Sequence, residues 1–164
     1  MNFGARGLLT QGSGPGNPVI DFLQSNMASA YNKYGSKINW VYEGDITSPT
    51  NVTKGKENPG VTVRDKSGKL SVYINSYAFS NQGLAYLVIG HEFVHANLLL
   101  NAQFDKWALK YDPVIAGAIS EFYAYAWQSR ASYLLGISDY GGADQMIKYV
   151  PFIPMAEIIN YSKR

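Results

Sequence analysis

Two histidines that lie four residues apart in a long apolar stretch constrain the fold more than any other feature of the chain. His91, Glu92 and His95 belong to the segment His-Glu-Phe-Val-His, and the chain of 164 residues contains 2 histidines in all. The neighbouring side chains from Leu87 to Leu98 are mostly apolar. Residues four apart share one face of an α-helix, so this segment predicts a largely buried helix with both imidazoles on the same side.

The spacing of these side chains suits a catalytic zinc ion. Two neutral imidazoles can bind the cation, a third protein ligand completes its anchor, and a water in the fourth position has its pKa lowered to about 7. Glu92 directly follows His91, so we expect it to act as the general base that takes the proton of this water as it attacks a carbonyl. The alternative is a helix with two buried, hydrogen-bonded histidines and a satisfied glutamate.

Residues 90–96, Gly-His-Glu-Phe-Val-His-Ala, resemble the active-site helix of zincin metallopeptidases. The resemblance implies zinc-dependent hydrolysis of peptide bonds in a protein or peptide substrate. It is specific for the chemistry, because two histidines and a glutamate occur at the spacing that the chemistry needs. The resemblance covers these seven residues directly, and about 45 residues if the predicted downstream helix is included.

The third metal ligand is expected to be a carboxylate, because the chain has no cysteine and no further histidine. The metzincin group has a third histidine where this chain has Asn101, so that pattern is excluded. Glu121 lies in a later predicted helix and resembles the third ligand of gluzincins, whereas Asp105, the rival, would resemble the ligand of aspzincins. The other carboxylates after the motif are Asp112, Asp139, Asp144 and Glu157. The expected zinc ligands are therefore His91, His95 and Glu121.

Turn and capping residues predict an α+β fold with a short antiparallel or mixed sheet, the motif helix, and a following helix that bears the third ligand. Residues 1–16 are expected to be a flexible lead-in, and residues 17–164 a single zincin-like domain. The predicted elements are a helix from Asn17 to Gly35, a strand at 37–43, a loop at 44–60, a hairpin of 61–64 and 70–75, the motif helix from Ser80 or Asn81 to about residue 102 or on to 109, a helix that begins at Asp112-Pro113, and short helices at 143–149 and 155–161.

The predicted strand at 70–75 directly precedes the motif helix. Zincins that resemble this arrangement use an edge strand there to bind an extended peptide, which would pair its backbone with the strand. An ordinary core strand is the equal alternative.

Two supporting roles have several candidates. Asp105 or Asp112 could orient a metal-bound imidazole through a hydrogen bond. Tyr123, Tyr125 and Tyr133 could donate a hydrogen bond to the oxyanion that forms during hydrolysis.

Composition narrows the choice of partners. The net charge is +2 and the basic residues are scattered, so we expect no nucleic-acid partner. We also expect no membrane span and no signal peptide, because the apolar stretches fall short of about 18 uninterrupted residues. Asn2-Phe3-Gly4-Ala5-Arg6 resembles the end of the core region in Rhs-type polymorphic toxins, although the usual Tyr-Asp-Pro continuation is missing. That resemblance implies a secreted toxin or effector protease, delivered within a larger polypeptide and matched by an immunity or inhibitor protein.

Two other functions remain open at this point. One is a zincin-like binding or interaction domain that holds a metal without turnover, or holds none. The other is a metal-dependent amide hydrolase that acts on peptidoglycan.

Overall fold

The computed structural model describes residues 16–45 and 50–163. These residues form helices and a small mixed sheet, which confirms the predicted α+β class. The chain divides into two compact units, one that extends to Glu92 and one that begins at Phe93. The expected lead-in at 1–16 and the segment Asn2 to Arg6 lie outside the described residues, apart from Gly16.

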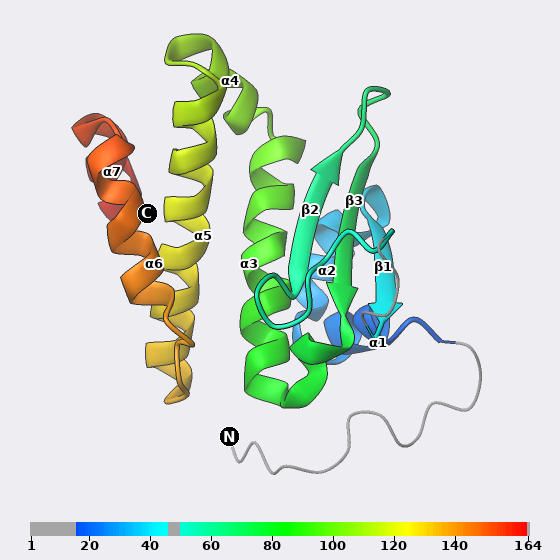
Figure 1. Ribbon diagram of the computed structural model, residues 1–164. Coiled ribbons are helices and arrows are strands. Elements are labelled where there is room, and N and C mark those ends of the chain that lie inside the picture. The colour runs from blue at the N-terminus through cyan, green and yellow to red at the C-terminus, as the bar shows by residue number, and fades with distance from the viewer. Residues whose placement is uncertain (1–15, 46–49, 164) are drawn as a thin grey trace. The chain divides into compact units, whose positions relative to one another are not determined.

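Figure 1 labels the helices and strands of both units. Their bounds are α1 Pro18–Asn26, α2 Ala28–Tyr34, η1 Gly35–Lys37, β1 Asn39–Gly44, β2 Gly60–Arg64, β3 Leu70–Asn75, η2 Ser76–Ser80, α3 Gln82–Leu100, α4 Gln103–Lys110, α5 Pro113–Leu135, α6 Gly142–Tyr149, η3 Val150–Phe152 and α7 Met155–Ser162.

The segment from Asn17 to Gly35 is two helices, so the prediction of one continuous helix was wrong. Its start is as predicted, because the Asn17 side chain accepts a hydrogen bond from the backbone N–H of Val19 and Pro18 follows the cap. The helix breaks at Met27, which has φ −136° and ψ 34°. The apolar side of α1 is buried, whereas α2 buries none of its residues, so the apolar stripe read from the sequence does not continue through the second helix.

The sheet has the strand order β1-β3-β2, with β1 parallel and β2 antiparallel to β3. The predicted hairpin is confirmed, and Thr62 of β2 lies opposite Val72 of β3. Because β3 is the central strand, residues 70–75 follow the alternative of an ordinary core strand and not that of an edge strand. Val72 and Ile74 on one face of β3 are 0% exposed, and Ser71 and Asn75 on the other face are also buried.

The core of the first unit contains apolar side chains of α1, such as Val19 and Leu23, and of the sheet, such as Val72 and Ile74. Figure 1 shows α1 behind the sheet. Phe79 packs edge-to-face against Phe22 of α1 and against Tyr42 of β1. The described part of the loop before β2 is held by Glu43, whose carboxylate accepts a hydrogen bond of 2.7 Å from the N–H of Val52 and another from Thr53. These contacts fix the approach of the chain to β2.

The motif helix α3 begins as predicted, because the Asn81 side chain accepts a 2.8 Å hydrogen bond from the N–H of Leu84. It ends at Leu100, and α4 is a separate helix, since Ala102 has a left-handed backbone with φ 54°. By length and composition α3 could cross a membrane, but 61% of its apolar window is buried. A buried core helix meets the same criteria, so this finding is weak evidence for a membrane span.

The second unit is built around α5. The Asp112 side chain accepts a 2.8 Å hydrogen bond from the N–H of Ile115, and Pro113 follows it, which confirms the predicted start of this helix. The helix ends at Gly136, where φ is 65°. Its buried side forms a core with residues of α3, α4 and the segment before α7; this core contains Leu98, Trp107, Ala116, Ile119, Phe122, Tyr123 and Ile153.

Candidate metal centre

His91 and His95 lie one turn apart on α3, as the sequence predicts. His91 is buried and the side chain of His95 is 13% exposed. The division between the compact units falls inside this helix, between Glu92 and Phe93, and the helix is continuous across it. The backbone of α3 itself therefore places the two imidazoles beside each other.

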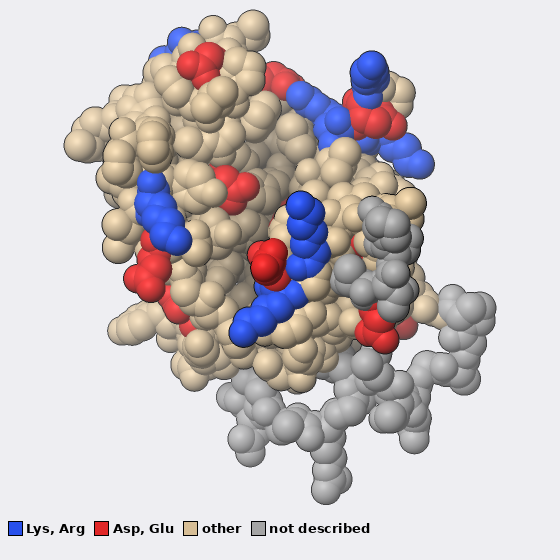
Figure 2. All heavy atoms as spheres, in the orientation of Figure 1, with Lys and Arg blue, Asp and Glu red and all other residues tan. Residues whose placement is uncertain are grey.

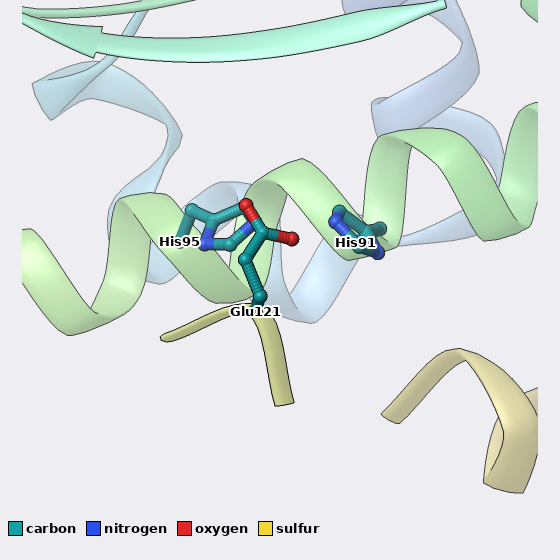
Figure 3. Close-up of side chains that lie close together, drawn as sticks. All are labelled: His91, His95 and Glu121. Carbon is teal, nitrogen blue, oxygen red and sulfur yellow. The ribbon is translucent and has the colours of Figure 1, made fainter. Parts of the chain in front are cut away.

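Glu121 comes from α5 and meets His95 within the second unit. The distance from its Oε1 atom to Nε2 of His95 is 3.6 Å, and its side chain is 35% exposed. One ligand atom from each of His91, His95 and Glu121 lies within 4.8 Å of the others. Figure 3 shows the Glu121 carboxylate reaching toward the imidazoles of α3. Glu121, a residue chosen from six carboxylates on the sequence, thus completes a group that could hold a metal ion.

The donor set and its spacing fit a zinc ion. Zinc binds imidazole nitrogen and carboxylate oxygen at about 2.0–2.2 Å, so the ligand atoms of a tetrahedral site lie about 3.3 Å apart. The separation of 3.6 Å between His95 and Glu121 is already close to this value. Because 4.8 Å bounds the remaining separations, the three ligand atoms lie close enough together that they could share one cation.

Asp105, the rival third ligand, does not belong to this group among the described residues. It lies in the first turn of α4. Asp112, a candidate for orienting an imidazole, instead caps α5 through its contact with Ile115. The cap uses one oxygen, Oδ1, of this carboxylate.

Ser120 makes the hydrogen bond to an imidazole that was expected of Asp105 or Asp112. Its Oγ atom lies 2.7 Å from Nδ1 of His95, and the serine is 5% exposed. A neutral imidazole carries one proton, so Nε2 can bind a cation only when that proton is on Nδ1, where Ser120 accepts it. The contact holds the ring in the orientation that directs Nε2 toward Glu121, and the hydroxyl can accept the Nδ1 proton of the tautomer that binds a cation through Nε2. Sequence reasoning missed this residue, although it directly precedes Glu121.

Glu92 is 6% exposed and does not belong to the three-residue group. Its carboxylate contacts the sheet of the first unit, where the Thr62 hydroxyl donates a hydrogen bond of 2.8 Å to Oε2. A Cβ atom added at Gly60 would lie 2.7 Å from Cγ of Glu92, so glycine makes room for this side chain. Neither β2 residue was identified from the sequence, because no local pattern connects a strand residue with a helix 30 residues away.

The three tyrosines proposed as oxyanion donors have different surroundings. Tyr123 lies in the core of the second unit and its hydroxyl donates to the backbone oxygen of Glu157 at 3.4 Å. Tyr133 is 85% exposed. Tyr125 lies one helical turn beyond Glu121 on α5 and stacks on Tyr149, with 6.2 Å between the ring centroids.

Tyr149 is a further tyrosine close enough to Glu121 to be influenced by its charge, and it was not among the candidates chosen from the sequence. Burial, and then the negative charge of Glu121, raise the pKa of its hydroxyl above the usual value of 10.0. The phenol is therefore protonated at neutral pH and can donate a hydrogen bond in the neighbourhood of Glu121. Its ring stacks on that of Tyr125, which lies one helical turn beyond Glu121 on α5.

The group of His91, His95 and Glu121 could hold a metal ion, and its assignment rests on these residues and their contacts. Comparisons of the chain with protein-family models, with curated proteins and with solved structures find no match.

Proposed function

We propose that the protein is a zinc-dependent peptidase of the zincin type, gluzincin-like in its third ligand. His91, His95 and Glu121 would hold the zinc ion, and Glu92 would be the general base. The observation that carries the proposal is that ligand atoms of His91 and His95 on α3 and of Glu121 on α5 lie within 4.8 Å of one another. The helix α3 also bears a buried glutamate directly after the first histidine.

A zinc ion bound there would act as a Lewis acid and lower the pKa of water to about 7. The protein groups would have separate tasks. Glu92 would accept a proton from the attacking water, Ser120 would keep Nε2 of His95 directed at the ligand group, and Tyr149 would offer a hydrogen bond to the substrate oxygen. Each task matches the hydrogen-bonding capacity of the group that performs it.

An extended peptide or protein segment is the proposed substrate. Because β3 is the central strand, the edge for backbone pairing near Glu92 is that of β2, which contacts this residue through Gly60 and Thr62. On the face in Figure 2, uncharged residues form most of the surface. A phosphate backbone needs a continuous basic face, and the net charge of +2 with scattered basic residues supports a peptide over a nucleic acid.

The narrower form of the proposal is a toxin or effector protease with an immunity or inhibitor protein as its partner, secreted or delivered as part of a larger polypeptide. The resemblance of residues 2–6 to Rhs-type toxins supports it. Sequencing the native gene upstream of Met1 tests this form, and a start codon with no upstream coding region would refute it.

The test of the enzymatic proposal is Glu92→Gln, with the exposed Glu57→Gln as the matched control. After zinc reconstitution, both variants and the wild type should bind one equivalent of zinc by mass spectrometry. Hydrolysis of fluorescently labelled casein should fall about 100-fold or more in Glu92→Gln and stay at the wild-type rate in Glu57→Gln. Unchanged hydrolysis in Glu92→Gln would refute the assigned base. Zinc binding without hydrolysis by the wild type would favour a binding domain.

A further inference from the structure

Strand β2 contacts Glu92 through two residues that lie on one face of the strand. Gly60 and Thr62 are two positions apart, so they point the same way from the sheet. A Cβ atom at Gly60 would lie 2.7 Å from Cγ of Glu92 and 3.0 Å from Cγ1 of Val88. Thr62, by contrast, supplies a hydroxyl. The glycine allows the close approach, and the threonine makes the polar contact that this approach permits.

The Thr62 hydroxyl can donate its single proton to either of two acceptors, both of which belong to Glu92. Its Oγ1 atom lies 2.8 Å from Oε2 of the Glu92 side chain and 3.1 Å from the Glu92 backbone oxygen. A hydrogen bond to a charged carboxylate is shorter and stronger than one to a neutral carbonyl. The proton therefore goes mainly to the carboxylate, and the contact acts on the orientation of the side chain.

We propose that Thr62 is a positioning residue for the general base. It engages Oε2 of Glu92 and leaves Oε1 to accept the proton of the attacking water, with Gly60 providing the space. A glutamate side chain has three rotatable bonds, and fixing them in advance removes an entropic cost from the reaction. The inference rests on the proposed role of Glu92 and adds a specific means by which the sheet controls it.

Three variants separate positioning from a general structural role. Thr62→Val keeps the shape of the side chain and removes the hydroxyl, whereas Thr62→Ser keeps the hydroxyl. Gly60→Ala keeps Thr62 but forces Glu92 to move. Ser71→Ala is the matched control, because it removes a hydroxyl from β3 that accepts a 3.2 Å hydrogen bond from Asn39.

The first measurement does not depend on turnover. Crystal structures of the full chain should show one orientation of the Glu92 carboxylate in the wild type, Thr62→Ser and Ser71→Ala. They should show a displaced or multiple orientation in Thr62→Val and Gly60→Ala. A Glu92 side chain that keeps its wild-type orientation in Thr62→Val would overturn the inference.

The second measurement is hydrolysis of labelled casein by the zinc-loaded proteins, with melting temperature and zinc content as checks on folding. Thr62→Val should lower kcat about tenfold or more and leave KM unchanged, and Thr62→Ser should restore kcat. Equal kcat in the wild type and Thr62→Val would overturn the inference. If the wild type does not hydrolyse casein but Thr62→Val displaces Glu92, the proposed function fails and the positioning contact stands.

Discussion

Substitution of Ser120 by alanine tests the metal centre without any knowledge of the substrate. The Ser120 hydroxyl lies 2.7 Å from Nδ1 of His95 and can accept the proton that Nδ1 carries when Nε2 binds a cation. Ser120→Ala removes this acceptor and leaves the other three groups of the site unchanged. We expect weaker zinc binding, because the imidazole loses the partner that fixes its proton and its orientation.

The expected loss follows from the burial of the two side chains. Ser120 is 5% exposed and the His95 side chain is 13% exposed, so water has little access to replace the hydroxyl. Loss of such a hydrogen-bond partner typically weakens metal binding about 10- to 100-fold. This corresponds to about 1.4–2.8 kcal/mol in binding free energy. The zinc dissociation constant of Ser120→Ala should rise by that factor.

The assay is competition for zinc with a chromophoric chelator at pH 7 and fixed ionic strength. Ser132→Ala is the matched control, because Ser132 lies on the same helix, is 3% exposed, and donates its 2.8 Å hydrogen bond to the backbone of Ser129. The control should bind zinc as the wild type does. Dissociation constants for Ser120→Ala and Ser132→Ala that agree within about twofold would refute the role of the hydroxyl in orienting His95.

Two further sets of variants test the third ligand and the stability of the second unit. Glu121→Gln should weaken zinc binding in the same competition assay far more than Asp105→Asn does, and the reverse order would identify Asp105 as the ligand. Glu157→Ala should lower the free energy of unfolding in urea by about 2–4 kcal/mol, because the buried indole N–H of Trp107 and the half-buried Tyr111 hydroxyl lose their acceptor. The exposed Glu57→Ala should change it little, and equal effects would contradict this account. Burial acts to raise the pKa of Glu157, but the hydrogen bonds that it accepts, led by that of Tyr111, lower it below the usual 4.5. Its contribution is therefore present above about pH 4.5 and lost as the pH falls below that value, so the stability difference between wild type and Glu157→Ala should shrink in acid.

The starts of α1, α3 and α5 were predictable because each has a local signal. Asn17, Asn81 and Asp112 all cap their helices through the side chain, and the first and last are followed by proline as the sequence indicates. A cap acts on backbone groups two or three residues away, so the information that defines it lies within one short segment.

The errors concern features that depend on distant packing. The stripe of apolar residues before Gly35 predicted one helix, but burial is confined to α1, and the spacing alone could not show which apolar residues face the core. The order of the strands was also not predictable. β1 pairs with β3 in parallel, and the paired segments are about 30 residues apart in the sequence. This pairing places residues 70–75 at the centre of the sheet.

The motif identifies the groups that carry the proposed chemistry but not the groups that orient them. Ser120 reaches His95 across 25 residues and Thr62 reaches Glu92 across 30 residues, whereas a helical pattern is read over spacings of three and four. Serine and threonine are also common in caps and turns, so their presence marks neither contact. A chain that kept His-Glu-Phe-Val-His and Glu121 but replaced both hydroxyls would look equally competent by its motif. It would nevertheless lose the contacts that orient His95 and the proposed base Glu92, because both are hydrogen bonds to other elements.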